Sequence, residues 1–499
     1  MQNPTRLHPA VRGPVLVVLA VVALLGVLGP GVAQAADGDG RVVRVGTEGT
    51  YPPFTYRDPR SNQLTGYDIE VMQAVAKETG WKLDFVTSTF DALFPALDSK
   101  RIDLIANQVT INPERQARYA FSTPYTYSRG VIVVAKGTKG ITSLADLKGK
   151  TTAQSETSNW AQVARDAGAK VQSVEGFAQA AALLKQGRVD AIVNDNIAVL
   201  DYLASTKTTD VRISGNAGSE ISKQALLFRS DDTALRDEAN AALAKLAKSG
   251  ALAKLSKSYF DADVSVADPG KVKLKGSDTG RSTWQVVQDT AGPMALAALK
   301  VTIPLTAISF LLGLVLALLA ALARLSGNRW VDAPARFYIS AIRGTPLLVQ
   351  LFIVFYGLPE IGVDLPRPVA AVLALSLNVG GYAAEIIRAS ILSVPRGQFE
   401  AATTIGMSYR LAMRRIVLPQ AARIAVPPLS NTLLSLVKDT SLVSVVLLTD
   451  LFRVAQNAAS VSSRTLALYL LAAVYYWIIC WVLSLVQRRM ERRLERYAT

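Results

Sequence analysis

The chain has 499 residues, half of them hydrophobic and 19% charged, and its formal net charge is +15. This length accommodates two or three domains. The positive charge does not indicate nucleic-acid binding, because much of it lies beside apolar runs, where basic residues mark the cytoplasmic side of membrane spans. The only cysteine, Cys480, excludes an intrachain disulfide. The composition therefore predicts one membrane region and one soluble region that is stabilised by its core alone.

The first 36 residues have the pattern of a secretory signal peptide. Arg6 and Arg12 precede an apolar stretch at 15–28, and the sequence Ala-Gln-Ala at 33–35 offers the small residues of a cleavage site. An uncleaved membrane anchor is the alternative. Either interpretation places the chain from residue 40 onward outside the cytoplasm.

Residues 40–263 alternate short apolar runs with helical patterns, which is typical of an α/β domain. A strand is expected at 42–46 and a helix at 67–78. The segments 90–107 and 177–194 echo each other, because each has an Ala- and Leu-rich helical pattern that leads into a short buried strand ending at Asn. The echo predicts two similar lobes, with chance recurrence of a common helix–strand unit as the alternative.

Polar residues follow both echoed strands. Asn107, Gln108 and Thr110 come after the first strand, and Asn194 and Asp195 come after the second. Because ligands of open α/β sheets bind beyond the carboxyl ends of the strands, we expect these side chains to face a cleft between the lobes.

A cation and an anion are expected on opposite walls of that cleft. Arg115 follows the turn-forming pair Asn112-Pro113, and its planar guanidinium suits the two oxygens of a carboxylate. Asp195 suits an ammonium group. One fixed charge of each sign is the minimal recognition of a zwitterionic α-amino acid, although each residue by itself could be a solvated surface charge.

Four motifs in this region resemble the polar-amino-acid solute-binding proteins of ABC importers. They are Glu-Gly-Thr-Tyr-Pro-Pro-Phe at 48–54, Leu-Thr-Gly-Tyr-Asp at 64–68, the segment 107–115, and Phe-Ser-Thr-Pro-Tyr at 121–125. The resemblance covers about residues 41–263. It implies a two-lobed clamshell of the periplasmic-binding-protein type that closes on its ligand.

The resemblance also implies roles for individual residues. Arg115 matches the carboxylate-binding arginine of the family, Asp195 the ammonium-binding aspartate, and Thr110 a hydroxyl that anchors the ligand backbone. Thr157 lies in a loop that usually touches the carboxylate, but Ser155-Glu156-Thr157-Ser158-Asn159 departs from the common Gly-Thr pattern. Aromatic residues that sandwich the ligand side chain are matched by Tyr51 and Phe90, for which core packing is the alternative, as it is for Trp160. The predicted substrate-binding residues are Glu48, Tyr51, Phe90, Asn107, Gln108, Thr110, Arg115, Thr157 and Asp195.

Within the family, the segments 107–109, 154–159 and 194–203 most resemble the cystine-binding branch. L-Cystine is therefore the expected ligand. Binders of glutamine or glutamate are the next most similar. Glu156 stands where a neutral residue is expected, which favours a basic amino acid as a further alternative.

Residues 261–281 lose all periodicity, since glycines at 270, 276 and 280 alternate with lysines and small polar residues. This composition predicts a flexible linker over residues 264–289. Such a tether would hold the binding domain at high effective concentration over the pore entrance.

Residues 290–490 are predicted to form an all-α transmembrane domain of about five helices, in apolar runs at 301–323, 344–359, 368–384, 424–449 and 465–487. A run of 23 residues is about 34 Å long as a helix, against a hydrocarbon core of about 30 Å. With the binding domain outside, the arginine-rich loops and the basic tail 491–499 fall on the cytoplasmic side, as the positive-inside rule requires. We therefore expect a multi-pass protein of the cell (plasma) membrane.

Charged residues within the spans are expected to be paired or functional. Glu385 and Arg388 are one helical turn apart and should pair with each other. Lys438 and Asp439 are adjacent in sequence, so they point in different directions and need different partners, at a dimer interface or along the translocation path.

The predicted cytoplasmic loop at about 396–420 carries the most specific motif of this region. Its spacing predicts a short helix, a glycine break and a second amphipathic helix that a proline caps. The spacing strongly resembles the EAA loop of ABC importer permeases, and 344–350 and 394–398 resemble further hallmarks of polar-amino-acid permeases. The resemblance implies docking to a separate ATPase, with a loop lying on the inner leaflet as the alternative. The coupling residues are Glu400, Ala401, Ala402, Gly406, Leu418 and Pro419.

No Walker A motif, nucleophilic triad or metal cluster is visible in the sequence. We therefore expect a transporter subunit rather than an enzyme, with no catalytic residue, no cofactor and no metal, and with ATP used by a partner. The expected complex contains two copies of this chain, joined through the membrane domain, and two copies of an ABC ATPase. The alternative class is a ligand-gated channel with a clamshell domain, which would need a re-entrant filter such as Thr-Val-Gly-Tyr-Gly.

Overall fold

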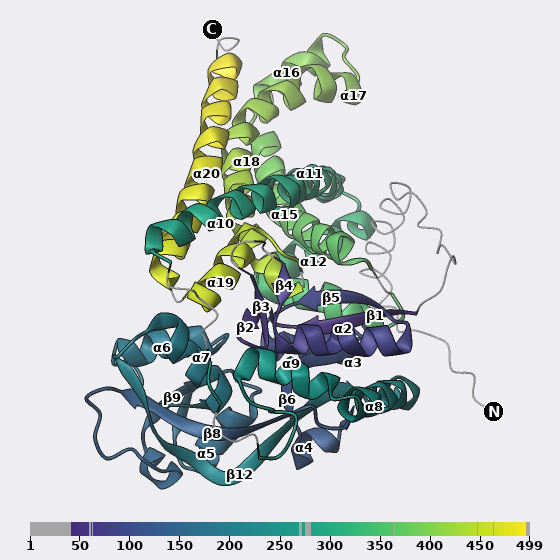
Figure 1. Cartoon of the computed structure of the whole chain (residues 1–499). Coiled ribbons are helices and arrows are strands. Elements are labelled where there is room, and N and C mark those ends of the chain that lie inside the picture. The colour runs from purple at the N-terminus through teal and green to yellow at the C-terminus, as the bar shows by residue number, and fades with distance from the viewer. Residues whose placement is uncertain are drawn as a thin grey trace, which may run out of the picture. The chain divides into compact units, whose positions relative to one another are not determined.

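The computed structural model (Figure 1) describes residues 41–58, 61, 63–268, 272–274, 281–363, 365–446, 448–462 and 464–495. The predicted signal peptide lies outside these residues. The chain divides into two compact units. The clamshell unit contains Asp39–Ala298 and Leu447–Ala473, and the helical unit contains mainly Leu299–Val446 and Val474–Thr499.

The clamshell unit is organised around a seven-stranded sheet of order β11-β8-β12-β6-β1-β5, in which β7 also pairs with β12. In the first lobe, β1 (Val42–Thr47) lies between β5 (Lys82–Thr87) and β6 (Leu104–Thr110) and is parallel to both. Two long antiparallel strands, β8 (Thr126–Ala135) and β12 (Val211–Arg229), carry the sheet from this lobe into the second.

Helices α2 (Tyr67–Thr79), α8 (Thr233–Lys248) and α9 (Ala251–Phe260) pack against one another beside the sheet of the first lobe, and Figure 1 shows them together. They share a core with the first-lobe strands that includes Phe54, Tyr67 and Phe228, all fully buried. The bounds of the remaining first-lobe elements are β2 (Thr50–Tyr51), β3 (Thr55–Arg57), β4 (Leu64–Thr65), α3 (Phe90–Asp98), α4 (Pro113–Gln116) and β7 (Tyr119–Phe121).

The second lobe has its own apolar clusters, one around Leu184 and Tyr202 and another around Trp160 and Leu147. It is connected to the rest of the unit through β11, which pairs with β8. Its elements are η1 (Leu144–Leu147), β9 (Thr151–Gln154), α5 (Asn159–Asp166), β10 (Lys170–Ser173), α6 (Phe177–Lys185), β11 (Ile192–Asp195) and α7 (Asn196–Thr206).

The structure confirms the predicted first strand, the predicted first helix and the echo. The repeated unit is α3 followed by β6 in one lobe and α6 followed by β11 in the other. The expected strand end at Asn107 is wrong, because β6 continues to Thr110. Within the strand, Gln108 has a left-handed conformation (φ 51°), and the register of the pairing with β12 shifts between Ala225 and Leu227. The polar residues Asn107, Gln108 and Thr110 therefore belong to the strand.

The predicted linker, residues 264–289, includes residues at both of its ends that belong to folded elements. Val264 is fully buried in the first-lobe core. At the other end, Ser282 caps helix α10 (Thr283–Ala297) through a capping box with Gln285. The last seven residues of the predicted linker are thus helical, because the cap and the apolar positions of α10 favour a helix there.

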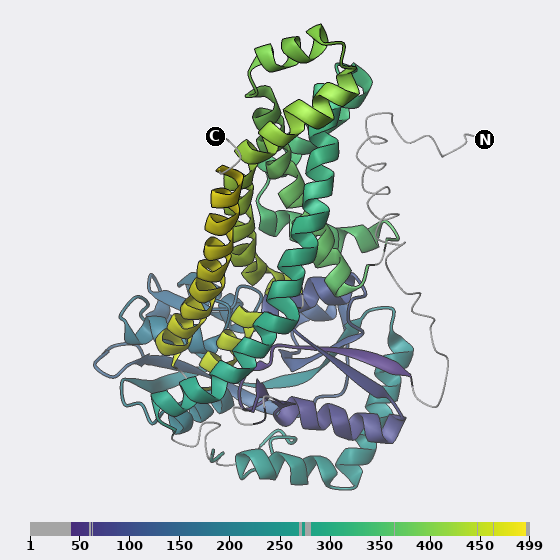
Figure 2. The same ribbon diagram turned by 90° about the horizontal axis from the view of Figure 1, so that it is seen from above.

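The helical unit is held together mainly by α11 (Ile303–Leu325) packing along α15 (Arg367–Leu392), while α12 (Arg329–Gly344) and α18 (Leu418–Asp439) also contact α15. Figure 2 shows α11 as a long teal helix running beside the green helices of this unit. A Cβ atom on Gly313 would lie 2.6 Å from Val379, so glycine allows the close approach of α11 and α15. The other elements are α13 (Leu347–Phe352), α14 (Leu358–Glu360), α16 (Arg396–Thr404), α17 (Tyr409–Ala412) and α20 (Thr465–Glu495), with π-turns at Ala298–Thr302, Ile353–Gly357 and Met413–Val417 and a 3₁₀ turn at Thr440–Val446.

Among the described residues, three helices are long and apolar enough to cross a membrane: Thr283–Leu325, Arg367–Leu392 and Thr465–Arg492. Arg329–Gly344 and Leu347–Gly357, which are bent by 111°, count as a fourth if together they make one span. The expected fifth span at 424–449 is not among them, because α18 ends at Asp439 and contains many polar residues. The five-span topology, which places the basic tail on the cytoplasmic side, therefore remains a prediction. The predicted tail 491–499 begins as a continuation of α20, which runs to Glu495.

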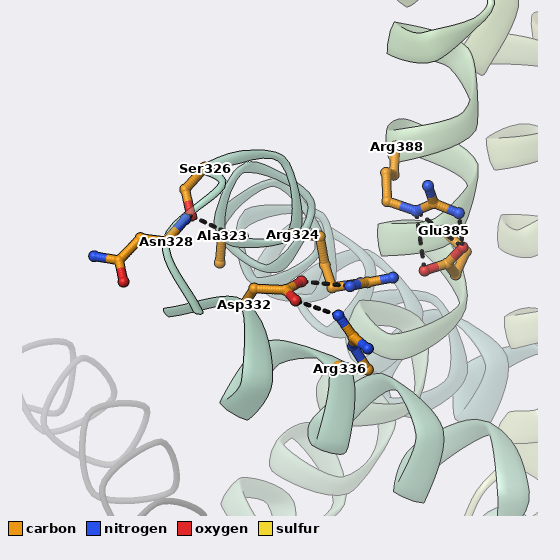
Figure 3. Close-up of polar contacts among 8 residues, drawn as sticks. All are labelled: Ala323, Arg324, Ser326, Asn328, Asp332, Arg336, Glu385 and Arg388. Carbon is orange, nitrogen blue, oxygen red and sulfur yellow. Dashed lines mark hydrogen bonds and ion pairs between the residues drawn. The ribbon is translucent and has the colours of Figure 1, made fainter. Parts of the chain in front are cut away.

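Charged residues of the helical unit form two local clusters, which Figure 3 shows in detail. Arg388 Nη2 and Glu385 Oε2 are 2.7 Å apart, which confirms the predicted pair. In the second cluster, Asp332 accepts hydrogen bonds from both Arg324 and Arg336. Each of the two acids, Asp332 and Glu385, is therefore paired with at least one arginine within the unit.

Candidate ligand-binding site

A pocket lies between the two lobes of the clamshell unit. Both lobes contribute aromatic and polar side chains to its walls, and Trp160 lies among them. Polar residues outnumber the aromatic ones in its lining, and small-molecule sites combine an apolar wall with placed polar groups of this kind. Of the nine predicted substrate-binding residues, six line this pocket: Glu48, Tyr51, Phe90, Asn107, Gln108 and Asp195.

Glu48 is held at the first-lobe wall by Asn107. The amide Nδ2 of Asn107 donates to Glu48 Oε2 at 2.6 Å, and the backbone N–H of Glu48 donates to Asn107 Oδ1 at 2.7 Å. Burial raises the pKa of the Glu48 carboxyl to about 7, and the bond from Asn107 opposes this rise. Near neutral pH, a cationic ligand group would favour its charged form.

Gln108 lines the pocket but directs its amide into the protein. Its Nε2 donates to Asp68 Oδ1 at 2.5 Å and to Thr126 Oγ1 at 3.1 Å, and its backbone N–H donates to Asp68 Oδ2 at 2.9 Å. The amide N–H groups of Gln108 are therefore used within the protein, and a contact of its side chain with the ligand stays a prediction. The left-handed backbone of Gln108, which is uncommon for a residue with a side chain, is fixed by the buried Asp68.

Asp195 lies at the end of β11 and accepts hydrogen bonds from four side chains. Ser128 and Gln224 donate to Oδ1, the latter at 3.3 Å, and Trp160 Nε1 and Tyr51 Oη donate to Oδ2 at 3.2 and 3.4 Å. Burial raises the pKa of Asp195, and these hydrogen bonds oppose the rise. The carboxylate is thus preorganised at the second-lobe wall.

Three of these donors were not predicted as site residues. Trp160 packs in the core of the second lobe, which was the alternative given for it from the sequence. Its indole N–H also donates to Asp195. A Cβ atom on Gly130 would lie 2.5 Å from the Trp160 ring. Ser128 and Gln224 lie on the long strands β8 and β12, whose pairing the sequence pattern did not reveal.

Arg115 lies in a neighbouring cavity rather than opposite Asp195. That cavity is lined by Arg115, Thr157 and Asp91 among others, and it shares Ser158 and Asn159 with the first pocket. Burial lowers the pKa of the guanidinium to about 10. The cation and the anion are therefore on adjacent cavities and not on facing walls of one.

The Arg115 guanidinium makes its described hydrogen bonds with backbone carbonyls. It donates to Thr110 O at 3.0 Å and to Thr157 O at 2.8 Å, and it lies 5.8 Å from the centre of the Phe90 ring. Thr110 lines neither cavity, and its hydroxyl is buried without a hydrogen-bond partner in the described part of the chain. Arg115 thus joins the first lobe to the Thr157 loop of the second.

Direct contacts hold the lobes together in this arrangement. Asp91 Oδ1 of the first lobe accepts from the Thr157 N–H at 2.9 Å and from its hydroxyl at 2.6 Å. On the other side, Tyr51 Oη donates to Asn194 Oδ1 at 3.1 Å. The clamshell is therefore closed. No motif identified Asp91 in advance, because an acid in the first turn of a helix is common for electrostatic reasons alone.

The predicted coupling loop forms a helix, a break and a second helix in the helical unit, and Figure 1 shows α16 and α17 beside each other at one end of it. Glu400 and Ala401 are exposed and Ala402 is buried. Gly406 has a φ of +77°, which suits glycine. Leu418 packs into a small core with Val417.

The expectation that Pro419 caps the second helix is wrong. The π-turn Met413–Val417 leads directly into α18, and Pro419 stands in its first turn. A proline is tolerated there because its missing N–H needs no partner in the first turn. The helix therefore continues through the motif to Asp439.

The motif at 344–350 forms the sharp bend between α12 and α13. Gln350 is buried, and its Nε2 donates to the carbonyl oxygens of Ile342 at 2.8 Å and Thr345 at 3.1 Å. Asn378 of α15 donates to Gln350 Oε1 at 3.0 Å. The side chain thus satisfies carbonyl groups near the break in the helix.

Comparison with known proteins covers both units. The family described as "Bacterial extracellular solute-binding proteins, family 3" matches residues 43–262, and "Binding-protein-dependent transport system inner membrane component" matches residues 313–496. The chain is 54% identical over 215 residues to the "L-cystine transport system permease protein TcyB" of Bacillus subtilis (strain 168), covering 43% of this chain and 92% of that protein.

Two solute-binding proteins are similar to the front part of the chain. The "L-cystine-binding protein TcyA" of Bacillus subtilis (strain 168) is 47% identical over 224 residues, which cover 45% of this chain and 83% of that protein. The "L-cystine-binding protein TcyJ" of Escherichia coli (strain K12) is 37% identical over 223 residues, which cover 44% and 83%.

Proposed function

Because the chain belongs to the amino-acid ABC importers and joins a family 3 solute-binding domain to an inner membrane permease component, we propose that it imports L-cystine with energy from ATP. The permease family implies an ATPase partner. We propose two copies of a separate ATPase subunit, a homodimer of this chain through its membrane domain, and no cofactor of its own.

One observation carries the choice of substrate. Two non-overlapping parts of the chain are similar to a binding protein and to a permease whose names both specify L-cystine, from the same organism. The binding part must recognise the substrate and the permease part must pass it, so the two similarities are separate supports for one ligand. An aromatic and polar pocket between closed lobes is consistent with an amino-acid ligand.

Asp195 is proposed to hold a ligand ammonium group. Its carboxylate is fixed by donors from both lobes and both long strands, so little reorganisation is needed on binding. Glu48 would hold a second cationic group, since L-cystine carries two ammonium groups. Tyr51 and Phe90 would pack on the ligand's apolar portion.

Arg115 is proposed to hold a ligand carboxylate. The guanidinium has five N–H donors, and the two hydrogen bonds described to Thr110 O and Thr157 O leave donors for a ligand. Ser158 and Asn159 line both the cavity of Arg115 and the pocket of Asp195, which supports a ligand that reaches both residues. An elongated amino acid with two charged ends fits two adjacent cavities better than a compact one.

A basic amino acid is the second candidate. It is favoured by the presence of two carboxyl groups, those of Glu48 and Asp195, in the one pocket. Calorimetric titration of the purified full chain with L-cystine, arginine, lysine, glutamine and glutamate separates the candidates. We expect the tightest binding for L-cystine. Tighter binding of arginine or lysine would replace it with the second candidate, and binding of none would reject the proposed site.

The exposed face of the coupling loop is proposed to bind the ATPase. Glu400 and Ala401 are exposed, and the large apolar side chains of Ile405 and Tyr409 beside them are 75% and 61% exposed. Exposed apolar residues rimmed by polar ones mark interaction sites. We place this loop in the cytoplasm and the clamshell on the extracytoplasmic face of the cell membrane.

A further inference from the structure

Helix α19 (Leu451–Ser462) belongs to the clamshell unit although it lies almost 200 residues after the binding domain in sequence. It contacts β2 and β3 of the first lobe and α6 and α7 of the second. Most of its side chains are buried, including Leu451 and Ala455, which are fully buried. A helix from the permease part of the chain is therefore packed against both halves of the clamshell.

Arg453 attaches this helix to the first lobe. It is 3% exposed, and its Nη2 donates to the carbonyl oxygen of Ser88 at 2.7 Å and to that of Glu48 at 3.0 Å. The Glu48 side chain lines the ligand pocket, and Ser88 comes two residues before pocket-lining Phe90. The N–H of Arg453 donates to Asp450 Oδ1 at 2.9 Å, which fixes the start of the helix.

Gln456 attaches the same helix to the second lobe. Its Nε2 donates to Glu175 Oε2 at 2.8 Å, and Glu175 precedes Gly176 in the wall of the ligand pocket. Arg453 and Gln456 are three residues apart, so they project from one face of the helix. A rigid helix with two such contacts spans the gap between the lobes beside the ligand.

We infer that α19 clasps both lobes of the closed clamshell through Arg453 and Gln456, so that substrate binding and docking of this helix strengthen each other. The inference rests on the proposed amino-acid import. Opening the lobes moves Glu175 away from Ser88, and the helix can then keep only one of the two contacts. Its docking energy therefore favours the closed state, and a coupling of this kind is reciprocal.

A further observation supports this role. The positive charge of Arg453 opposes the raised pKa of the Glu48 carboxyl. Docking of α19 thus favours the charged form of Glu48, the form that holds a ligand cation.

Helix α19 is also close in sequence to a membrane helix. The candidate span Thr465–Arg492 begins three residues after α19 ends. Phe452 contacts Tyr469 of that helix, with ring centres 5.3 Å apart. A change in docking at the clamshell is therefore transmitted over a short connection to the membrane domain.

The test measures L-cystine binding to the full chain in lipid nanodiscs by calorimetry. All proteins carry Cys480→Ser, so that no thiol exchanges with the ligand. We expect Arg453→Met to weaken binding about tenfold or more, because two hydrogen bonds from a charged group are lost. Gln456→Ala should weaken it by a smaller factor.

Arg464→Met is the matched control. Arg464 donates to the carbonyls of Arg281 and of Ser462, the last residue of α19, and to the hydroxyl of Thr283. None of these described partners is in either lobe, so the variant tests a contact at the end of α19 that does not touch the clamshell lobes. We expect it to bind L-cystine as the parent does. If the parent binds and Arg453→Met, Gln456→Ala and Arg464→Met all retain its affinity, the clasp is refuted while the proposed function stands. If the parent itself binds no amino acid, the proposed function fails first.

Discussion

Asn107 and Glu48 exchange two hydrogen bonds, one from the Asn107 side-chain amide to the Glu48 carboxylate and one from the Glu48 backbone N–H to the side-chain oxygen Oδ1 of Asn107. This exchange links strand β6 to the end of β1 at the wall of the ligand pocket. It keeps a buried acid in a fixed position without a full countercharge. The protonation of this buried acid therefore contributes to the pH dependence of stability.

The first prediction concerns pH. The pKa of Glu48 is about 7, above its ordinary value of 4.5, so the folded protein binds a proton more tightly than the unfolded one. This contribution to stability is present below pH 4.5 and is lost as the pH rises to about 7. The ligand-free full chain should therefore lose stability over this window, and Glu48→Gln should lose less, by on the order of 1–3 kcal/mol. Thermal unfolding between pH 4.5 and 8 measures the difference.

The control for this experiment is Glu114→Gln, which changes an exposed glutamate of the same lobe. It should reproduce the parent's pH profile. Burial also raises the pKa of Asp68 to about 7. Every variant therefore keeps part of the loss of stability with rising pH. A Glu48→Gln profile that coincides with the parent profile would contradict the assignment.

The second prediction concerns Arg115. Arg115→Met should reduce amino-acid affinity about a hundredfold, because a bidentate charge-assisted contact to the ligand carboxylate is lost. Arg118→Met is a close match, since Arg118 lines the same cavity but is largely exposed. Calorimetry on the two variants should give a large loss for the first and none for the second. Equal affinities would exclude Arg115 from the site.

The third prediction concerns the bend in the helical unit. Gln350→Leu leaves the carbonyls of Ile342 and Thr345 and the amide of Asn378 without their partner, so it should destabilise the protein by about 1–3 kcal/mol. Gln398→Leu changes an exposed glutamine and should cost little. Thermal unfolding in detergent compares them. A Gln350→Leu variant as stable as the parent would show that water replaces these bonds.

The fourth prediction concerns the coupling loop. Gly406→Ala puts a side chain at φ +77° and should strain the turn by about 1 kcal/mol. Gly397→Ala is the control, because an added Cβ meets nothing at either position and Gly397 lies in a helix. We expect normal ligand binding in both and reduced substrate-stimulated ATP hydrolysis only with Gly406→Ala.

Glu400→Lys tests the same loop by charge instead of shape. Glu400 is exposed, so its replacement should leave the fold and ligand binding unchanged. Uptake in proteoliposomes should fall strongly, because the exposed loop face is proposed to meet the ATPase. Full uptake by Glu400→Lys would remove this residue from the coupling interface.

Much of this fold could be predicted from sequence because its signals are local. The echo of 90–107 and 177–194 reports two helix–strand units, and each was found as α3–β6 and α6–β11. Glu385 and Arg388 were predicted to pair from helical spacing alone, and they do. Both signals lie within a short continuous segment of the sequence, so they can be read without knowledge of the tertiary contacts.

Several of the differences depend on contacts between distant segments. The left-handed conformation of Gln108 is stabilised by Asp68, 40 residues earlier. Arg115 donates to the backbone of Thr157, 42 residues later, and it lines a different cavity from Asp195. Helix α19 was not predicted, because its partners Glu48 and Ser88 lie more than 360 residues away.

The most direct test of the account is the uptake of labelled L-cystine into proteoliposomes that contain the full chain and the ATPase subunit that copurifies with it. With ATP on the side of the coupling loop, we predict accumulation above the external concentration, and without ATP none. Equilibration of L-cystine that proceeds equally without ATP would indicate a channel, and no uptake under any condition would contradict the proposed import.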